Sequence, residues 1–209
     1  MKKENIDYSV YLVTDHRDKT DAEFLKVIEE AINGGTTIVQ LREKTASTKD
    51  FYDLALKVKE ITSKYDVPLL INDRIDIAIA VDSEGVHIGQ DDMPADIARR
   101  IIGEDKILGV SASTVNEAIK AESDGADYIG SGAVFPTATK DDADAVSKQQ
   151  LKDIVNSIDI PVVAIGGINL DNAGTLKDTG IAGFSVVSAI MSAEDPREAS
   201  RKLKEIYQS

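Results

Sequence analysis

The stretch "PLLINDRIDIAIAVDSEGVHIGQDDMP", residues 68–94, contains two short apolar runs, "PLLIN" and "GVHIGQ", joined by a longer segment. Near-continuous apolar runs indicate strands that are covered on both faces, and alternation with helices indicates a parallel sheet. Polar residues follow each run directly: Asn72, Asp73 and Arg74 after the first, and Asp91 and Asp92 after the second. The stretch therefore predicts two parallel strands that each end in polar side chains.

The same arrangement is repeated along the chain. Between the runs lie segments with helical spacing, as in "DAEFLKVIEEAIN", where Phe24, Ile28 and Ile32 fall on one face. Eight candidate strands fit a (β/α)8 TIM barrel better than an open doubly wound sheet, which more often has about five or six strands. We predict an α/β fold, a single (β/α)8 TIM barrel domain over residues 1–209, with helix N-caps at Asp21, Thr48, Thr114 and Asn169. The six apolar runs outside the opening stretch are "YSVYLVT" from Tyr8, "TIVQLR" from Thr37, "ILGVSA" from Ile107, "YIGSGAVF" from Tyr128, "PVVAIGG" from Pro161 and "GFSVVSAI" from Gly183.

Composition narrows the class of protein. The 24 Lys and Arg residues and 37 Asp and Glu residues give a formal net charge of −13, which repels nucleic acid and anionic lipid. The absence of cysteine excludes disulfides, thiolate metal sites and cysteine nucleophiles. No apolar run has the length of a signal peptide or a membrane span. We expect a cytoplasmic protein that binds small molecules rather than nucleic acid or membrane, and a homo-oligomer is compatible with the sequence.

Two aspartates, Asp73 and Asp92, follow neighbouring strands of the predicted barrel. In such barrels the functional groups sit at the C-terminal ends of the strands, so these carboxylates are expected to meet at one rim. Without cysteine or a histidine cluster, the pair suits a hard cation such as Mg²⁺, which takes one or two carboxylates and leaves its other positions to water and phosphates. Each aspartate alone is equally typical of a helix cap or a solvated loop.

Four cations, Arg42, Lys44, Arg74 and Lys140, also follow predicted strands. Gln40, Arg42 and Lys44 alternate, which aims them to the same side while the chain stays extended. Any one of the cations alone is typical of an ordinary surface residue. Together, beside a Mg²⁺ pair in an acidic protein, they indicate a polyphosphate ligand.

A second phosphate site is indicated by the loops after the seventh and eighth runs. Gly166 and Gly167 allow close approach of the backbone, and the amides of Val187 and Ser188 follow the last strand. These loops often bind phosphate in TIM barrels. A tight turn explains the two glycines equally well.

The sixth run leads into "VFPTATKDD", which raises a further candidate site. Thr137 and Thr139 place two hydroxyls close together, and Lys140 adds a cation, although such a segment is also typical of a solvated loop. Of the two histidines, His87 lies within its strand and is expected to be a satisfied core or rim residue, and His16 has no assigned role. No Ser/His/Asp triad can be assembled, which disfavours covalent acyl transfer.

Together the motifs resemble those of the thiamine phosphate synthase (thiamine-phosphate pyrophosphorylase) family. The resemblance rests on "YLVTD", "QLREK", "INDRIDIAIAVDSEGVHIGQDDMP", "LGVSAST", "GADYIGSGAVFPTATK", "PVVAIGGIN" and "GFSVVSAI", in family order and across nearly the whole chain. It implies a (β/α)8 barrel enzyme, a transferase that joins 4-amino-2-methyl-5-hydroxymethylpyrimidine diphosphate to 4-methyl-5-(2-phosphoethyl)thiazole or its carboxylated form. The implied products are thiamine phosphate and pyrophosphate, formed with Mg²⁺ by a dissociative substitution.

The resemblance also implies roles for individual residues. Lys140, Arg42 and Ser111 would be catalytic, and Asp73 and Asp92 would bind Mg²⁺. The pyrimidine diphosphate would contact Gln40, Leu41, Arg42, Glu43, Lys44, Asn72, Ser111 and Lys140. The thiazole phosphate would contact Thr137, Ala138, Thr139, Gly167, Val187 and Ser188.

The chain departs from the family pattern at a few positions. Ala112 and Ser113 stand where many members have Val-His, and Ala133 and Ala138 replace a proline and a polar residue. A related thiazole tautomerase is the nearest competing function, but it uses the histidine that Ser113 replaces. A noncatalytic thiazole-phosphate-binding regulatory barrel would not need a diphosphate clamp. A phosphosugar isomerase would need an acid or base for proton transfer.

Overall fold

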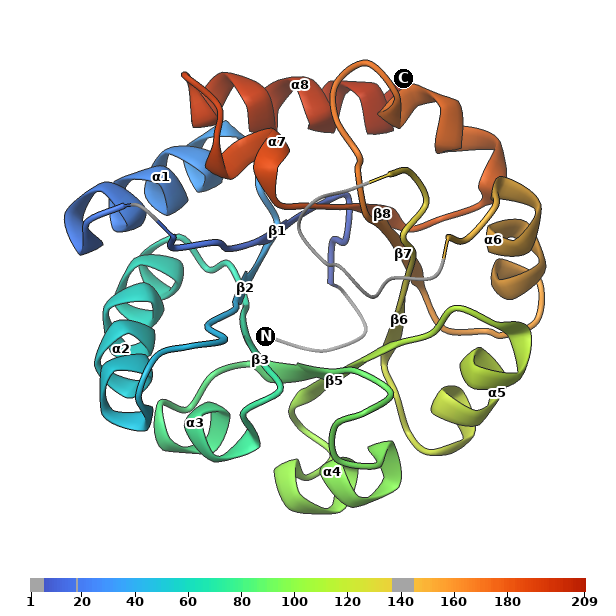
Figure 1. Ribbon diagram of the computed structural model, residues 1–209, viewed down its shortest axis with the longest axis horizontal. Coiled ribbons are helices and arrows are strands. Elements are labelled where there is room, and N and C mark those ends of the chain that lie inside the picture. The colour runs from blue at the N-terminus through green and yellow to red at the C-terminus, as the bar shows by residue number, and fades with distance from the viewer. Residues whose placement is uncertain (1–5, 18, 137–144) are drawn as a thin grey trace.

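The eight predicted strands form a closed parallel barrel. The computed structural model describes residues 6–17, 19–136 and 145–209, and in it each strand pairs with the next in chain order while β8 closes on β1. Figure 1 shows the strands at the centre and the helices around them. The (β/α)8 barrel prediction is confirmed. The strands are β1 (Val10–Val13), β2 (Ile38–Leu41), β3 (Leu69–Asn72), β4 (Gly85–Ile88), β5 (Ile107–Ser111), β6 (Tyr128–Ser131), β7 (Val162–Ile165) and β8 (Gly183–Val186).

The strands are apolar throughout because both of their faces are covered. In β3, Leu69 and Ile71 belong to the cluster that packs strands against helices, whereas Leu70 lies between them in a second cluster inside the barrel. The inner cluster also contains Tyr11 and Tyr128. Successive side chains of a strand point to opposite faces, so the residues facing the barrel interior alternate with those facing the helices.

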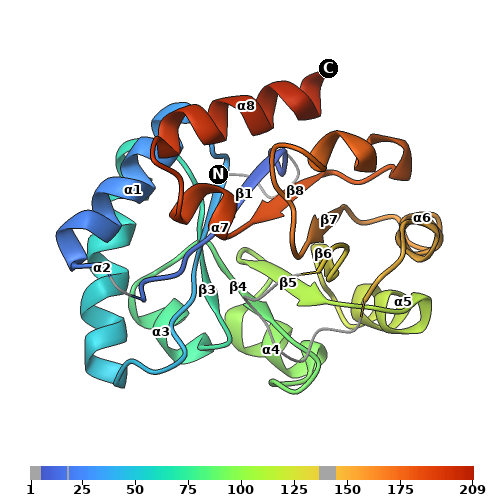
Figure 2. The same cartoon turned by 45° about the horizontal axis from the view of Figure 1, so that its top comes forward.

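The helices form the outer layer. Figure 2 shows the last helix, α8, beside the first helix, α1, so the outer layer of helices closes on itself as the barrel does. None of the helices in the described part of the chain combines the length and the hydropathy that a membrane-spanning segment requires. The helices are α1 (Asp21–Gly34), α2 (Thr48–Lys64), α3 (Ile75–Ala80), α4 (Ala95–Ile102), α5 (Val115–Ser123), α6 (Lys148–Val155), α7 (Ser188–Met191), α8 (Pro196–Gln208) and the 3₁₀ helix η2 (Ala173–Thr179).

The predicted N-caps are corrected at three of four positions. Thr114 caps α5 through a capping box with Glu117, as predicted. The residues that cap α1 and α2 are instead Thr20 and Ser47, one position before Asp21 and Thr48. Asn169 does not cap an α-helix: its side chain accepts from the amides of the next two turn residues, Asp171 and Asn172, ahead of η2.

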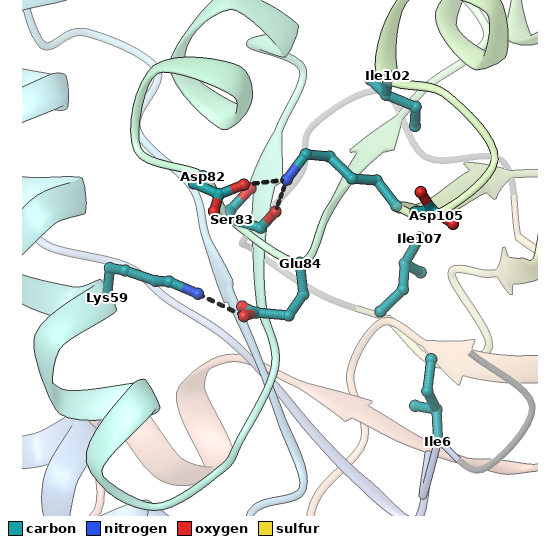
Figure 3. Close-up of a pocket in the computed structure, with 9 residues that line it drawn as sticks. Ile6, Lys59, Asp82, Ser83, Glu84, Ile102, Asp105 and Ile107 are labelled. Atoms are coloured by element: carbon teal, nitrogen blue, oxygen red, sulfur yellow. Dashed lines mark hydrogen bonds and ion pairs between the residues drawn. The ribbon is translucent and has the colours of Figure 1, made fainter. Parts of the chain in front are cut away.

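A pocket of about 410 Å³ lies at the N-terminal ends of the strands, and its walls are already ion-paired. Lys59 and Glu84 form one ion pair across it (Figure 3). Lys106 forms another with Asp82 at 2.7 Å and also donates to the carbonyl of Ser83. Because this rim of a TIM barrel serves mainly stability, we assign these pairs to the scaffold.

Arg99 is a buried cation that joins several loops of the same rim. The residue is only 7% exposed, and its side chain donates to the carbonyls of Gly103, Lys106 and Gly125 and pairs with Asp127 at 2.6 Å. Removing one partner of a buried, hydrogen-bonded charge pair leaves the remaining polar groups poorly solvated.

Arg99→Met is therefore expected to lower the free energy of unfolding by about 3 to 5 kcal/mol. Urea denaturation followed by circular dichroism measures this change. Arg100→Met is the matched control, because Arg100 is exposed on the same helix, and it should shift the unfolding free energy by less than about 0.5 kcal/mol. Equal effects of the two substitutions would contradict the assigned role of Arg99.

Candidate active site

A second pocket, of about 400 Å³, opens at the C-terminal ends of the strands. Residues that follow each of the strands β2 to β8 line it, so segments far apart in sequence meet at one rim. The sequence-predicted residues among its lining are Gln40, Arg42, Lys44, Asn72, Asp73, Asp92, Ser111, Gly167, Val187 and Ser188. The predicted contacts Thr137, Ala138, Thr139 and Lys140 lie outside the described residues.

The end of β2 supplies the polar wall of the pocket. Gln40 is buried and its amide donates to the hydroxyl of Tyr11 at 2.6 Å. The backbone amide of Arg42 donates to the hydroxyl of Thr14 at 3.1 Å, which anchors the chain just past the strand. Lys44 reaches across to Asp73 of the next strand end, with 2.5 Å between its Nζ and Oδ2. The alternating spacing therefore brings Gln40, Arg42 and Lys44 to one pocket, as the sequence indicated.

Leu41 and Glu43, the other two residues of this motif, have side chains outside the pocket lining. Leu41 is fully buried in the cluster between strands and helices. The carboxylate of Glu43 lies 3.7 Å from His16, and its burial raises its pKa while the histidine opposes that shift. Since alternate residues of an extended chain face opposite ways, only the backbone of Leu41 and Glu43 is left to contact a ligand in the pocket.

Asp73 and Asp92 come together at the rim, as their positions on neighbouring strands predicted. Partial burial raises the pKa of the Asp92 carboxyl, and Asp73 raises it further, whereas the amide of Gly89 and the cation of Lys44 oppose the shift. The amide of Gly89 donates to Asp92 at 2.7 Å. Asp73 has a left-handed backbone with φ of 62°, a conformation that aspartate tolerates better than most residues.

This carboxylate pair fits a magnesium ion. The charge of Asp73 disfavours ionisation of the neighbouring Asp92, which a divalent cation at the pair would offset, and oxygen ligands are those that Mg²⁺ prefers. Among the described residues, no group of three or more His, Cys, Asp or Glu side chains could hold a metal. A cation at this pair would therefore take its remaining ligands from water and substrate phosphates.

Arg74 does not join the pocket, which corrects the expected convergence of four cations. Its guanidinium donates to Asp76 at 2.6 Å and to the hydroxyl of Thr48 at 3.1 Å, and it is absent from the pocket lining. The turn after Asn72 directs it toward the helices. Of the predicted cations in the described residues, Arg42 and Lys44 are the ones that face the pocket.

The loops after β7 and β8 form the opposite wall. Gly166 and Gly167 both have positive φ, and a Cβ on Gly167 would lie 2.5 Å from the carbonyl oxygen of Pro136. Only glycine allows the loop after β7 to approach the segment after β6 this closely. Val187 and Ser188 border the same space, with Ser188 at the start of the short helix α7. This is the position at which TIM barrels often bind phosphate.

Tyr11 and His87 are among the pocket residues that were not predicted from the sequence as part of the site. Tyr11 lies in the middle of β1, and both ring nitrogens of His87 are hydrogen-bonded, to Tyr128 and to Ser111. The expectation that His87 is a satisfied histidine is confirmed, but it also lines the pocket. The usable signal was strand alternation, which places His87 beside Asn72 on the interior of the barrel.

Comparisons with known proteins agree with this geometry. The family described as "Thiamine monophosphate synthase" matches residues 10–190. A thiamine-phosphate synthase of Methanobrevibacter smithii is 63% identical over 199 residues, covering 95% of each chain. One of Clostridium tetani is 56% identical over 203 residues, covering 97% of each chain.

A solved structure supports the same conclusion at the level of the fold. The thiamine phosphate pyrophosphorylase of Pyrococcus furiosus has a TM-score of 0.89 and 41% identity, and the match covers 97% of this chain and 96% of that one. The similarity in fold and in sequence extends over nearly the whole chain. The chain belongs to the thiamine monophosphate synthase family and is a transferase.

Proposed function

We propose that this enzyme condenses 4-amino-2-methyl-5-hydroxymethylpyrimidine diphosphate with a thiazole phosphate, giving thiamine phosphate and pyrophosphate. The observation that carries the proposal is the division of one pocket into two walls. One wall holds a carboxylate pair with Arg42 and Lys44, and the other holds the glycine loop and Ser188. Such a pocket suits two substrates with one diphosphate and one phosphate group between them.

The cationic wall is suited to the diphosphate. Arg42 offers a planar fork of N–H donors, and Lys44, already held by Asp73, offers a point charge beside it. Asn72 is buried at the base of the same wall and presents a further polar group. These groups would orient the diphosphate and stabilise the negative charge that grows on it as it departs.

Asp73 and Asp92 would hold Mg²⁺ on this side of the pocket. The ion would neutralise charge on the diphosphate and so favour its departure. Lys44 is positioned to assist, because it contacts Asp73 directly and exerts its charge on Asp92 as well.

The proposed substitution reaction requires little proton transfer by the protein. The bond between the pyrimidine methylene carbon and the diphosphate oxygen breaks first, and the electron pair leaves with pyrophosphate. The aminopyrimidine ring delocalises the resulting carbocation, and the lone pair of the thiazole nitrogen then forms the new C–N bond. No proton has to be removed from that nitrogen, so a pocket built from positioning and charge-stabilising groups is sufficient.

The thiazole phosphate would bind at the opposite wall. Gly167, Val187 and Ser188 lie where the loops after β7 and β8 converge, and their backbone amides and the Ser188 hydroxyl are suitable phosphate donors. The contacts of Thr137, Ala138, Thr139 and Lys140 with the substrates remain predictions from the sequence. They would complete the junction between the two substrates from β6.

The tautomerase and the regulatory barrel are weaker candidates. A tautomerase would use a histidine at position 113, where this chain has serine. A sensor of thiazole phosphate would have no use for two carboxylates and a lysine gathered at the opposite wall.

Phosphorus NMR of the purified enzyme with both substrates and Mg²⁺ tests the proposal. We expect the diphosphate doublets of the pyrimidine substrate to be replaced by the single resonance of pyrophosphate, in parallel with formation of thiamine phosphate. Thiazole phosphate alone should stay unchanged. Isomerisation of that compound alone would support a tautomerase, and binding without any reaction would support a sensor.

A further inference from the structure

A chain of hydrogen bonds crosses the interior of the barrel beneath the pocket. It runs from the Gln40 amide to the Tyr11 hydroxyl at 2.6 Å and from there to the Tyr128 hydroxyl at 2.6 Å. It continues from Tyr128 to His87 Nδ1 at 2.8 Å and from His87 Nε2 to the Ser111 hydroxyl at 3.0 Å. Both ends of the chain, Gln40 and Ser111, line the pocket. We call Gln40, Tyr11, Tyr128, His87 and Ser111 the barrel relay.

The two tyrosines of the barrel relay are almost completely buried, whereas His87 is half-buried and, like Tyr11, borders the pocket. Tyr11 is 1% exposed and Tyr128 is fully buried. Burial raises the pKa of both phenols above the ordinary tyrosine value, so each keeps its single proton. In such an environment each hydroxyl must accept from one neighbour and donate to the other, because an unpaired polar atom would be costly.

These constraints give the barrel relay a direction. With the Gln40 amide as donor, Tyr11 donates to Tyr128, and Tyr128 donates to Nδ1 of His87. His87 then carries its proton on Nε2 and donates to Ser111. The Ser111 hydroxyl, having accepted from His87, has its own proton left for the pocket. The carbonyl oxygen of the Gln40 amide is likewise left as an acceptor.

We propose that Tyr11, Tyr128 and His87 are positioning residues that fix which pocket group donates and which accepts. The barrel relay presents an acceptor at Gln40 and a donor at Ser111, on the two sides of the same pocket. An aminopyrimidine has the complementary groups, since its amine donates and its ring nitrogens accept. The inference rests on the proposed function for the identity of this ligand, but the direction of the barrel relay is a property of the protein alone.

Nitrogen NMR of ¹⁵N-histidine-labelled enzyme tests the direction. The chain has two histidines, and His16→Gln identifies the signals of His87 by leaving them in place. The ring shifts distinguish a proton on Nδ1, on Nε2 or on both. We expect His87 to carry its proton on Nε2 only. A proton on Nδ1, a mixture of the two forms, or a doubly protonated ring would overturn the proposal.

Variants at the two ends of the barrel relay test how the direction is transmitted. Tyr11→Phe does not touch His87, yet it removes the group that sets the orientation of Tyr128, so both neutral forms of His87 should appear. Ser111→Ala, at the pocket end, should leave the proton on Nε2. The assigned direction would be contradicted if the His87 proton stayed on Nε2 alone in Tyr11→Phe, or if it left Nε2 in Ser111→Ala.

Steady-state kinetics separates positioning from packing. Tyr11→Phe and Tyr128→Phe should each lower kcat by about tenfold, and the double variant should lose no more than either alone, because each breaks the same chain. Tyr8→Phe is the matched control: its ring lies 5.1 Å from that of Tyr128, but its hydroxyl is not part of the barrel relay. It should keep the wild-type kcat. Additive losses, or an equal loss in Tyr8→Phe, would overturn the positioning role.

The activity assay of the proposed function and the nitrogen NMR of His87 can fail independently of each other. An inactive wild-type enzyme whose His87 carries its proton on Nε2 would count against the proposed function while supporting the barrel relay. An active enzyme whose His87 form is mixed would overturn the barrel relay and leave the proposed function standing.

Discussion

Asp92→Asn is expected to lower kcat/KM by about two to three orders of magnitude, with most of the loss in kcat, because it halves the carboxylate charge offered to Mg²⁺. The substitution is nearly isosteric, and its amide oxygen can still accept from Gly89. Initial rates measured across a Mg²⁺ titration give the comparison. The variant should need much more Mg²⁺ for half-maximal rate, while its affinity for thiazole phosphate should match wild type.

Asp92→Asn is also expected to raise the stability of the metal-free protein, although it lowers the activity. The folded state raises the pKa of Asp92, so folding favours its protonated form, and the ionised carboxylate present at neutral pH costs stability. The metal-free Asp92→Asn enzyme should therefore have a higher Tm than wild type at pH 7. The difference should shrink as the pH falls through the raised pKa and Asp92 becomes protonated.

Asp96→Asn serves as the matched control. Asp96 is exposed in the first turn of α4, close in sequence but outside the pocket lining. It should leave kcat/KM and the Mg²⁺ requirement unchanged. If Asp92→Asn retained full activity, or if it lost thiazole phosphate affinity instead of metal dependence, the metal assignment would be wrong.

Arg42→Met is expected to lower kcat by about 100-fold. The substitution keeps most of the side-chain length but removes the guanidinium from the pocket lining. Because the negative charge on the leaving group increases toward the transition state, the loss should fall more on kcat than on the KM for the pyrimidine substrate. Arg42→Lys should recover only part of the rate, since it restores the charge without the planar fork.

Arg74→Met distinguishes the structure from the sequence-based expectation. Arg74 also follows a strand, but its side chain is bound to Asp76 and Thr48 rather than turned into the pocket. The kcat of the Arg74→Met variant should stay within about twofold of wild type, as expected for a surface substitution away from the site. A loss as large as that of Arg42→Met would show that Arg74 turns into the pocket when substrate binds.

The barrel was readable from the sequence because its strands are covered on both faces. Continuous apolar runs such as "PLLIN" and the polar residues directly after them gave both the fold and the rim. Strand order alone then brought Asp73 and Asp92 together, since β3 and β4 are neighbours. What could be predicted was therefore the location of groups along the barrel.

The direction of individual side chains was harder to predict. Leu41 and Glu43 lie within a motif of pocket residues, but strand alternation turns them away from the pocket. The direction of the Arg74 side chain depends on the backbone angles of the turn before it, and no local sequence pattern predicts those angles. The barrel relay depends on barrel closure, because Tyr11 and Tyr128 are 117 residues apart in sequence and meet only across the interior.

The most direct test of the central claim is a single-turnover reaction with enzyme in excess over the pyrimidine diphosphate and with saturating thiazole phosphate and Mg²⁺. If one pocket holds both substrates, each mole of pyrimidine diphosphate should give one mole of pyrophosphate and one mole of thiamine phosphate at the same rate. Pyrophosphate released without an equal amount of thiamine phosphate, or no release of either product, would contradict the proposed two-substrate pocket.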